Sequence, residues 1–201
     1  MANDFYYRVK RAKEKRKNFL TLLMAWRGHP RIRLDISDKP VFITRHAAYK
    51  SPENGHNSLE DIFVSAGQLD REIPFVCLIN PKTQIIEETI RGSIGIFGFC
   101  DWHKGKLLQR AYAKARERKL KIMLGHTHPQ NYGPVCSSIQ RPEDGPFGGD
   151  FTEIWEMMKL NDLVSRFHII LTPRNNLIGV FELKKAGRVI YHPLLEIETK
   201  G

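Results

Sequence analysis

The chain has 201 residues, which is enough for one domain with extensions and a substantial core. Its three cysteines, Cys77, Cys100 and Cys136, are odd in number and lack the two-residue spacing of a zinc knot, which argues against disulfides and a thiolate metal site. The longest apolar run near the start, residues 19–26, is too short to span a membrane. We therefore expect a cytoplasmic protein without a membrane segment.

The net charge of +10 is concentrated at the start of the chain. Residues 1–33 hold ten Lys and Arg against two acidic residues, giving +8, so the rest carries the remaining +2. We divide the chain into a basic arm, 1–33, and a body, 34–201. Apolar residues recur at steps of three and four over 4–26, which predicts an amphipathic helix in the arm. Its charge suits an acidic partner, nucleic acid or simple solvation.

The apolar periodicity of the body predicts alternating strands and helices. Strands are expected at 41–44, 74–80, 84–90, 93–99, 121–124, 167–172, 177–183 and 188–197. Helices are expected at 58–69, at 101–119 and from 150 onward. The second of these helices carries basic residues four apart, predicted to form a solvated stripe: Lys106, Arg110, Lys114 and Arg118. This order of elements predicts an α/β or α+β domain with a mixed sheet flanked by helices.

Two histidines, His126 and His128, follow the predicted strand at 121–124. Side chains two residues apart on an extended backbone point the same way, so both imidazoles can reach one cation. Neutral imidazole is the commonest transition-metal ligand, and catalytic zinc sites use three protein ligands. The competing interpretation is a pair of loop histidines bonded to backbone or solvent.

Asp150 is the natural third ligand, because it opens a helix that must pack back on the sheet. Together with Glu153, three positions further on, it also forms a capping box, and one carboxylate can serve both roles. The intervening residues, 129–149, hold four prolines and four glycines, which predicts a long functional loop.

The series His-Thr-His-Pro followed by an aspartate at a helix start resembles the JAMM motif of MPN/JAB-domain zinc metalloproteases, over about 58–183. The layout from Glu72 to the histidines also resembles the RadC branch. The resemblance implies an MPN/JAB-like fold, Zn2+ on His126, His128 and Asp150, and Glu72 as the general base. It implies hydrolysis of a peptide or isopeptide bond in a protein substrate, with a ubiquitin-like tail as one candidate.

The chain departs from the family pattern at the motif serine, which is Phe147 here. The loop before Asp150 is longer than the family's, so Ser137 or Ser138 could occupy the serine's place. Other glutamates compete with Glu72 for the role of base: Glu53, Glu87 and Glu88.

Three further functions remain open beside the peptidase. They are a non-catalytic MPN-type scaffold, a RadC-like protein associated with DNA, and a hydrolase that uses Cys136 as nucleophile with His126. Stoichiometric metal with hydrolysis would favour the peptidase over the scaffold. Salt-sensitive DNA binding would favour the RadC-like protein.

Overall fold

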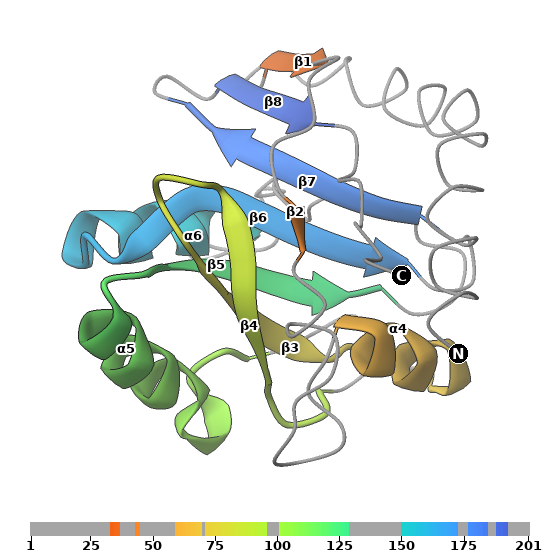
Figure 1. Cartoon of the computed structure of the whole chain (residues 1–201). Coiled ribbons are helices and arrows are strands. Elements are labelled where there is room, and N and C mark those ends of the chain that lie inside the picture. Colours follow the sequence, from red (N-terminus) through yellow and green to blue (C-terminus); the bar gives the residue numbers. More distant parts are fainter. Residues whose placement is uncertain are drawn as a thin grey trace, which may run out of the picture.

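The computed structural model describes residues 33–36, 43–44, 59–69, 71–95, 101–128, 150–172, 177–184 and 188–192. Within these residues the strands form one mixed sheet with helices on both faces, so the fold class is α+β (Figure 1). The sheet order is β1-β8-β7-β6-β5-β3-β4-β2. The strands are β1 (Arg33–Ile36), β2 (Ile43–Thr44), β3 (Pro74–Ile79), β4 (Ile85–Arg91), β5 (Lys121–Thr127), β6 (Val164–Thr172), β7 (Leu177–Leu183) and β8 (Arg188–His192). The helices are α4 (Leu59–Gln68), a short 3-10 helix η1 (Lys104–Lys106), α5 (Leu107–Arg118) and α6 (Asp150–Leu160).

The middle of the sheet is β5, which pairs with β3 on one side and β6 on the other. The β3–β5 pair is antiparallel, with Pro74 opposite His126. The β5–β6 pair is parallel, with Leu124 opposite His168 and His126 opposite Ile170. Because side chains alternate along a strand, Leu124, His126 and His168 all point to the same face of the sheet.

Apolar side chains cover both faces of the sheet. Helices α5 and α6 pack on one face, through residues that include Leu107, Ala111 and Ile154. Helix α4 packs on the other face, through residues that include Ile62 and Phe63. The strands at the centre are therefore buried on both sides, which explains their continuous apolar runs.

The predicted helix over 101–119 is wrong at its start, because α5 begins only at Leu107. Gly105 has φ 66° and Lys106 has φ 59°, and these left-handed conformations cannot belong to a right-handed helix. The apolar residues of this segment are buried: Leu107, Leu108, Ala111, Ala115 and Leu120.

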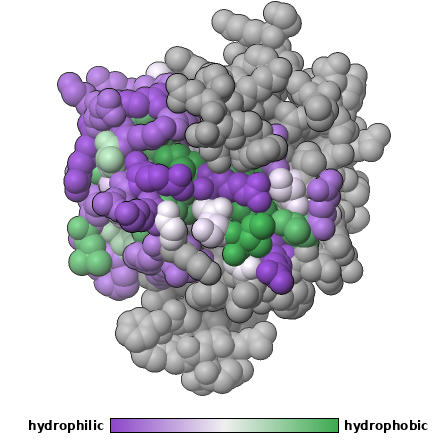
Figure 2. Space-filling model, turned by 90° about the horizontal axis from the view of Figure 1, so that it is seen from below, coloured by the Kyte–Doolittle hydropathy of each residue, from purple (hydrophilic) through white to green (hydrophobic). Residues whose placement is uncertain are grey.

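The basic stripe on α5 is exposed but not simply solvated. Lys114 Nζ lies 2.5 Å from Glu88 Oε1, and Arg118 Nη1 lies 2.8 Å from Glu88 Oε2. Arg118 also lies 3.8 Å from Glu87. The predicted outward-facing stripe is confirmed as exposed, and its C-terminal half also forms ion pairs with acidic residues of β4. Figure 2 shows a largely hydrophilic surface on the side where α5 lies in Figure 1.

Most predicted strands of the body are present, with changes at their ends. β3 and β4 lie within one residue of the predicted ranges, and β7 matches its range. β5 continues to Thr127 and β6 begins at Val164, so each is three residues longer than predicted at that end. Residues 93–95 are not in a strand, so the strand predicted at 93–99 is wrong in its described part.

Other predictions fall outside the described residues: the helix at 4–26, the loop at 129–149, and residues 41–42 and 193–197 of two predicted strands. Arg33, the last residue of the predicted arm, is the first residue of β1. Among the described residues, no helix combines the length and the apolar composition needed to cross a bilayer.

Candidate metal centre

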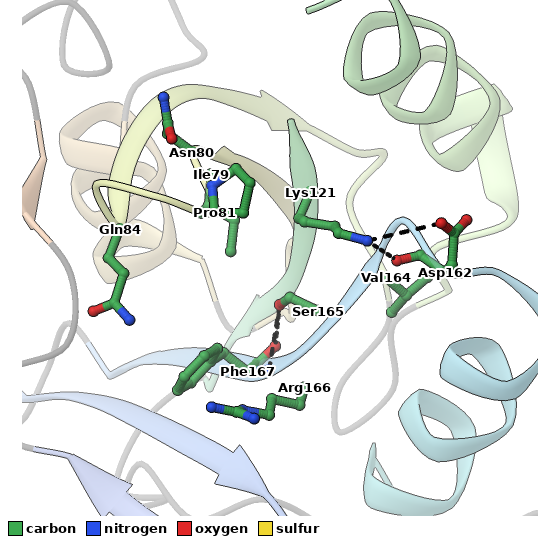
Figure 3. A pocket seen from close by; sticks show the side chains of 10 residues that line it. All are labelled: Ile79, Asn80, Pro81, Gln84, Lys121, Asp162, Val164, Ser165, Arg166 and Phe167. Carbon is green, nitrogen blue, oxygen red and sulfur yellow. Dashed lines mark hydrogen bonds and ion pairs between the residues drawn. The ribbon is translucent and has the colours of Figure 1, made fainter. Parts of the chain in front are cut away.

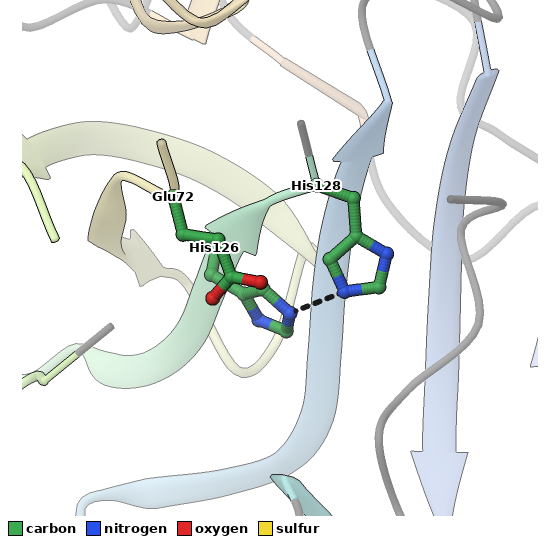
Figure 4. A group of neighbouring side chains, drawn as sticks. All are labelled: Glu72, His126 and His128. Carbon is green, nitrogen blue, oxygen red and sulfur yellow. Dashed lines mark hydrogen bonds between the residues drawn. The ribbon is translucent and has the colours of Figure 1, made fainter. Parts of the chain in front are cut away.

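Glu72, His126 and His128 come together beside the carboxyl end of β5 (Figure 4). One ligand atom from each residue lies within 4.8 Å of the other two, and all three residues are buried. His126 Nε2 lies 2.9 Å from His128 Nε2. This group could hold a metal ion, and it is the one such group among the described residues.

The pairing of β3 with β5 places Glu72 beside the histidines. It continues beyond β3, because Ile73 N donates to Thr127 Oγ1 at 2.9 Å and Thr127 N donates to the Ile73 main-chain oxygen at 3.1 Å. One residue further, the same register places Glu72 opposite His128. Because side chains alternate between the two faces along a strand, the Glu72 side chain points to the same face of the sheet as His126 and His128. Two residues far apart in sequence thus meet through strand register alone.

Gly125 allows β5 to lie close to its neighbours at this point. A Cβ at this position would lie 2.4 Å from Phe75 Cε2 and 2.6 Å from Ile169 Cγ2, and both of those side chains are buried. Contacts this short do not occur between carbon atoms, which prefer about 3.5–4.0 Å. The glycine before the histidine pair therefore fixes how closely the strand that carries the pair packs.

His168, which the sequence analysis did not single out, contacts His126 from β6. Its Nε2 lies 3.0 Å from Nδ1 of His126, the ring nitrogen that is not directed at His128. The Trp102 ring meets the His126 and His168 rings edge to face, at 5.9 and 5.8 Å between centroids. Trp102 Nε1 donates to the Gly125 main-chain oxygen at 2.9 Å. A lone histidine within the apolar run of β6 was the sequence signal that could have identified this residue.

Burial sets the protonation of these histidines. It lowers the pKa of His126 to about 3, so this imidazole is neutral near pH 7 and has a lone pair for a metal. Burial also lowers the pKa of His168, and the His126 and His128 rings lower it further. The Leu124 main chain beside the ring has a smaller, opposing effect that raises this pKa, so the pKa of His168 remains well below its usual value. His168 Nδ1 makes no well-formed hydrogen bond among the described residues.

The other predicted site residues are only partly described. Asp150 is the first residue of α6, as the sequence predicted, but its side chain lies outside the described part of the structure. Glu87 and Glu88 lie on β4 and pair with Arg118 of α5, so neither belongs to the group with the histidines. Four further candidates lie outside the described residues: Glu53, Cys136, Ser137 and Ser138.

A second buried carboxylate lies on the other face of the sheet, away from the histidine group. Glu182 Oε1 lies 2.6 Å from Arg166 Nε and 2.5 Å from Lys184 Nζ, and its Oε2 lies 2.9 Å from His192 Nε2. Burial raises the pKa of Glu182, but hydrogen bonds from Lys184 and His192 and the charge of Arg166 outweigh burial, so its pKa is lowered. With these partners Glu182 belongs to a structural ion-pair cluster.

A hollow of about 320 Å³ lies near the amino end of β5, whereas the histidine pair lies at the other end of this strand (Figure 3). Lys121 lines it, and its Nζ donates to the Asp162 main chain and lies 3.9 Å from the Asp162 carboxylate. Arg166 also lines it and already pairs with Glu182. Both cations have acidic partners within the chain, and the hollow contains none of the metal-site residues.

The donor set of the histidine group fits a transition metal. Two imidazoles with one carboxylate form a ligand set of catalytic zinc sites, whereas calcium and magnesium sites are built from oxygen ligands. The facing Nε2 atoms are close enough to share one cation. No protein-family model matches the chain, and none of the curated proteins compared with it matches either.

Proposed function

We propose that the protein is a zinc-dependent metallopeptidase or isopeptidase of the JAMM type, built on an MPN/JAB-like domain. The observation that carries this proposal is the buried group of Glu72, His126 and His128, with ligand atoms within 4.8 Å of one another. Zinc, when bound, supplies a Lewis acid that polarises water and a substrate carbonyl. The two histidines offer nitrogen donors for the metal, and Glu72 brings a carboxylate beside them.

In this proposal His126 and His128 hold the metal, and Asp150 completes the ligand set. Glu72 acts as the general base, taking a proton from the attacking water and returning it to the leaving amine. All three residues of the group are buried: His126 is 1% exposed, and Glu72 and His128 are each 8% exposed.

The reaction points to a protein or peptide substrate, because the combination of a metal and a base is suited to amide hydrolysis at neutral pH. A ubiquitin-like tail joined through an isopeptide bond is one candidate. The excess charge of +8 over residues 1–33 suits an acidic protein partner or nucleic acid. We propose the arm as the segment that binds such a partner.

Metal content tests the centre directly. The purified protein should contain about one zinc per chain. The His128→Ala variant should lose that zinc on dialysis against a weak chelator. His103→Ala is the matched control, since the His103 side chain is 66% exposed, and it should keep its zinc. Full zinc retention by His128→Ala would refute the centre.

A Glu72→Gln variant tests the role of the carboxylate. The amide keeps the shape but cannot take up a proton, so zinc should stay while hydrolysis of a peptide library and of a ubiquitin-type isopeptide falls about 10²–10⁴-fold. Glu87→Gln is the control and should keep its activity, because Glu87 lies on β4 beside α5. Loss of zinc in Glu72→Gln would instead make Glu72 a ligand.

A wild-type protein that holds zinc but hydrolyses nothing would favour the scaffold, and salt-sensitive DNA binding would favour the RadC-like alternative.

A further inference from the structure

We infer that His168 is a positioning residue for the metal centre: it accepts a hydrogen bond from Nδ1 of His126 and so keeps Nε2 of His126 available as the ligand atom. The inference rests on the proposed function, since it concerns the same centre. Its basis is the row of three rings in which His168 Nε2 lies 3.0 Å from His126 Nδ1, and His126 Nε2 lies 2.9 Å from His128 Nε2.

The number of protons on each imidazole decides which nitrogen donates in the hydrogen bonds between the three rings. A neutral imidazole carries one N–H, so His126 can use only one of its two nitrogens as a donor. If Nδ1 donates to His168, Nε2 keeps its lone pair. If instead His168 donates to Nδ1, the proton of His126 moves to Nε2, which then faces His128 and cannot bind a cation. The tautomer of His126 therefore decides whether the centre is ready to take up metal.

The proposed ligand set favours the first direction. His126 Nε2 is the nitrogen that faces His128, so a cation shared by the two histidines takes the lone pair of that atom. The single proton of a neutral His126 is then on Nδ1, and His168 Nε2, 3.0 Å away, is placed to accept it. Metal-binding histidines generally donate their second N–H to a fixed acceptor, which sets both the tautomer and the ring angle. In this chain the acceptor is another histidine.

The two rings are also held in place, so that the hydrogen bond is maintained. Trp102 contacts both rings edge to face and is anchored to β5 by its bond to the Gly125 main-chain oxygen. His168 is fully buried, and His126 is 1% exposed. Water therefore does not compete for the lone pair of His168.

Two variants of His168 separate this role from plain packing. His168→Leu fills the space but offers no acceptor, and its dissociation constant for Zn2+, measured against a chromophoric chelator, should rise about 10–100-fold. In His168→Gln the amide oxygen can stand near the position of Nε2 and accept the bond, so the affinity should stay near that of the wild type. His192→Gln is the control, because His192 is also buried but bonds to Glu182. Wild-type affinity in His168→Leu would overturn the inference.

The tautomer itself can be observed without any metal or substrate. Long-range ¹H–¹⁵N spectra of the metal-free wild-type protein should show His126 protonated at Nδ1, and His168→Leu should show a mixture of tautomers. A proton on Nε2 of His126 in the wild-type protein would overturn the inference, even if the variants fold poorly. If the wild type binds no Zn2+, the proposed function fails. The spectra would then still decide whether His168 accepts the bond.

Discussion

A Gly125→Ala variant tests how closely β5, the strand that carries His126, packs against its neighbouring strands. The added Cβ would lie 2.4 and 2.5 Å from two atoms of the Phe75 ring and 2.6 Å from Ile169 Cγ2. Carbon atoms pack at about 3.5–4.0 Å, so each contact must open by about 1 Å. Both neighbours are buried in the core and lie on opposite sides of β5, which leaves the strand no free direction in which to move.

Overpacking of a buried site costs about 1–3 kcal/mol, and we expect Gly125→Ala to fall at about 3 kcal/mol. For a chain of this size that loss corresponds to a fall in melting temperature of about 6–12 °C. Urea unfolding followed by circular dichroism measures the stability, and chelator competition measures Zn2+ affinity, which should also fall because His126 follows directly in the strand.

A double variant provides the control for this prediction. Phe75→Leu removes the ring atoms that Cβ would meet, so adding Gly125→Ala in that background should cost about 1 kcal/mol less than in the wild type. The cost should not vanish, because Ile169 stays in place. A Gly125→Ala protein with wild-type stability and Zn2+ affinity would show that β5 is not seated as we describe.

Three other regions give independent tests. Trp102→Phe removes the hydrogen bond to the β5 main chain and should cost about 2–4 kcal/mol in urea unfolding, more than Trp155→Phe on the half-buried face of α6. Burial raises the pKa of the Cys77 thiol to about 12. In a variant whose other cysteines are replaced by serine, Cys77 should therefore react with a disulfide reagent only after unfolding. Rapid labelling of the native protein would contradict this prediction. Although burial raises the pKa of Glu182, its cationic partners lower it overall, so it stabilises the fold above its unfolded pKa and less as pH falls through the folded pKa. The stability gap between the wild type and Glu182→Gln should therefore shrink in acid, and a gap that widens would refute the assignment.

The sequence predicted the elements whose signals are local. Alternation and apolar runs located β3, β4 and β7 closely, because burial of a strand leaves its mark on adjacent residues. The start of α5 was misplaced because the left-handed conformations at Gly105 and Lys106 depend on how the chain enters the helix. The basic residues of α5 gave no sign that Glu88 on another strand would pair with them.

In the candidate site, too, the sequence could predict only the residues whose relation to one another is local. The histidine pair could be predicted because its two members point the same way on a single strand. Glu72 was favoured over Glu87 and Glu88 only through the resemblance, because its place beside the histidines depends on which strand lies next to β5, and local periodicity does not predict strand order. His168 was missed for the same reason, since its contact with His126 spans 42 residues and arises only from the parallel pairing of β5 with β6.

The wide sequence separation within the centre has a kinetic consequence. The Ile73–Thr127 bond that carries Glu72 to the histidines closes 54 residues of chain, and the His126–His168 contact closes 42. Contacts this distant form late, because the entropy of closing each loop must be lost before the contact stabilises anything. The histidine group with its Glu72 and its positioning residue His168 is thus complete only after both β3 and β6 have paired with β5. Added zinc should therefore slow unfolding and leave the refolding rate nearly unchanged, because a ligand that recognises only the finished arrangement stabilises the native state and not the transition state that precedes it.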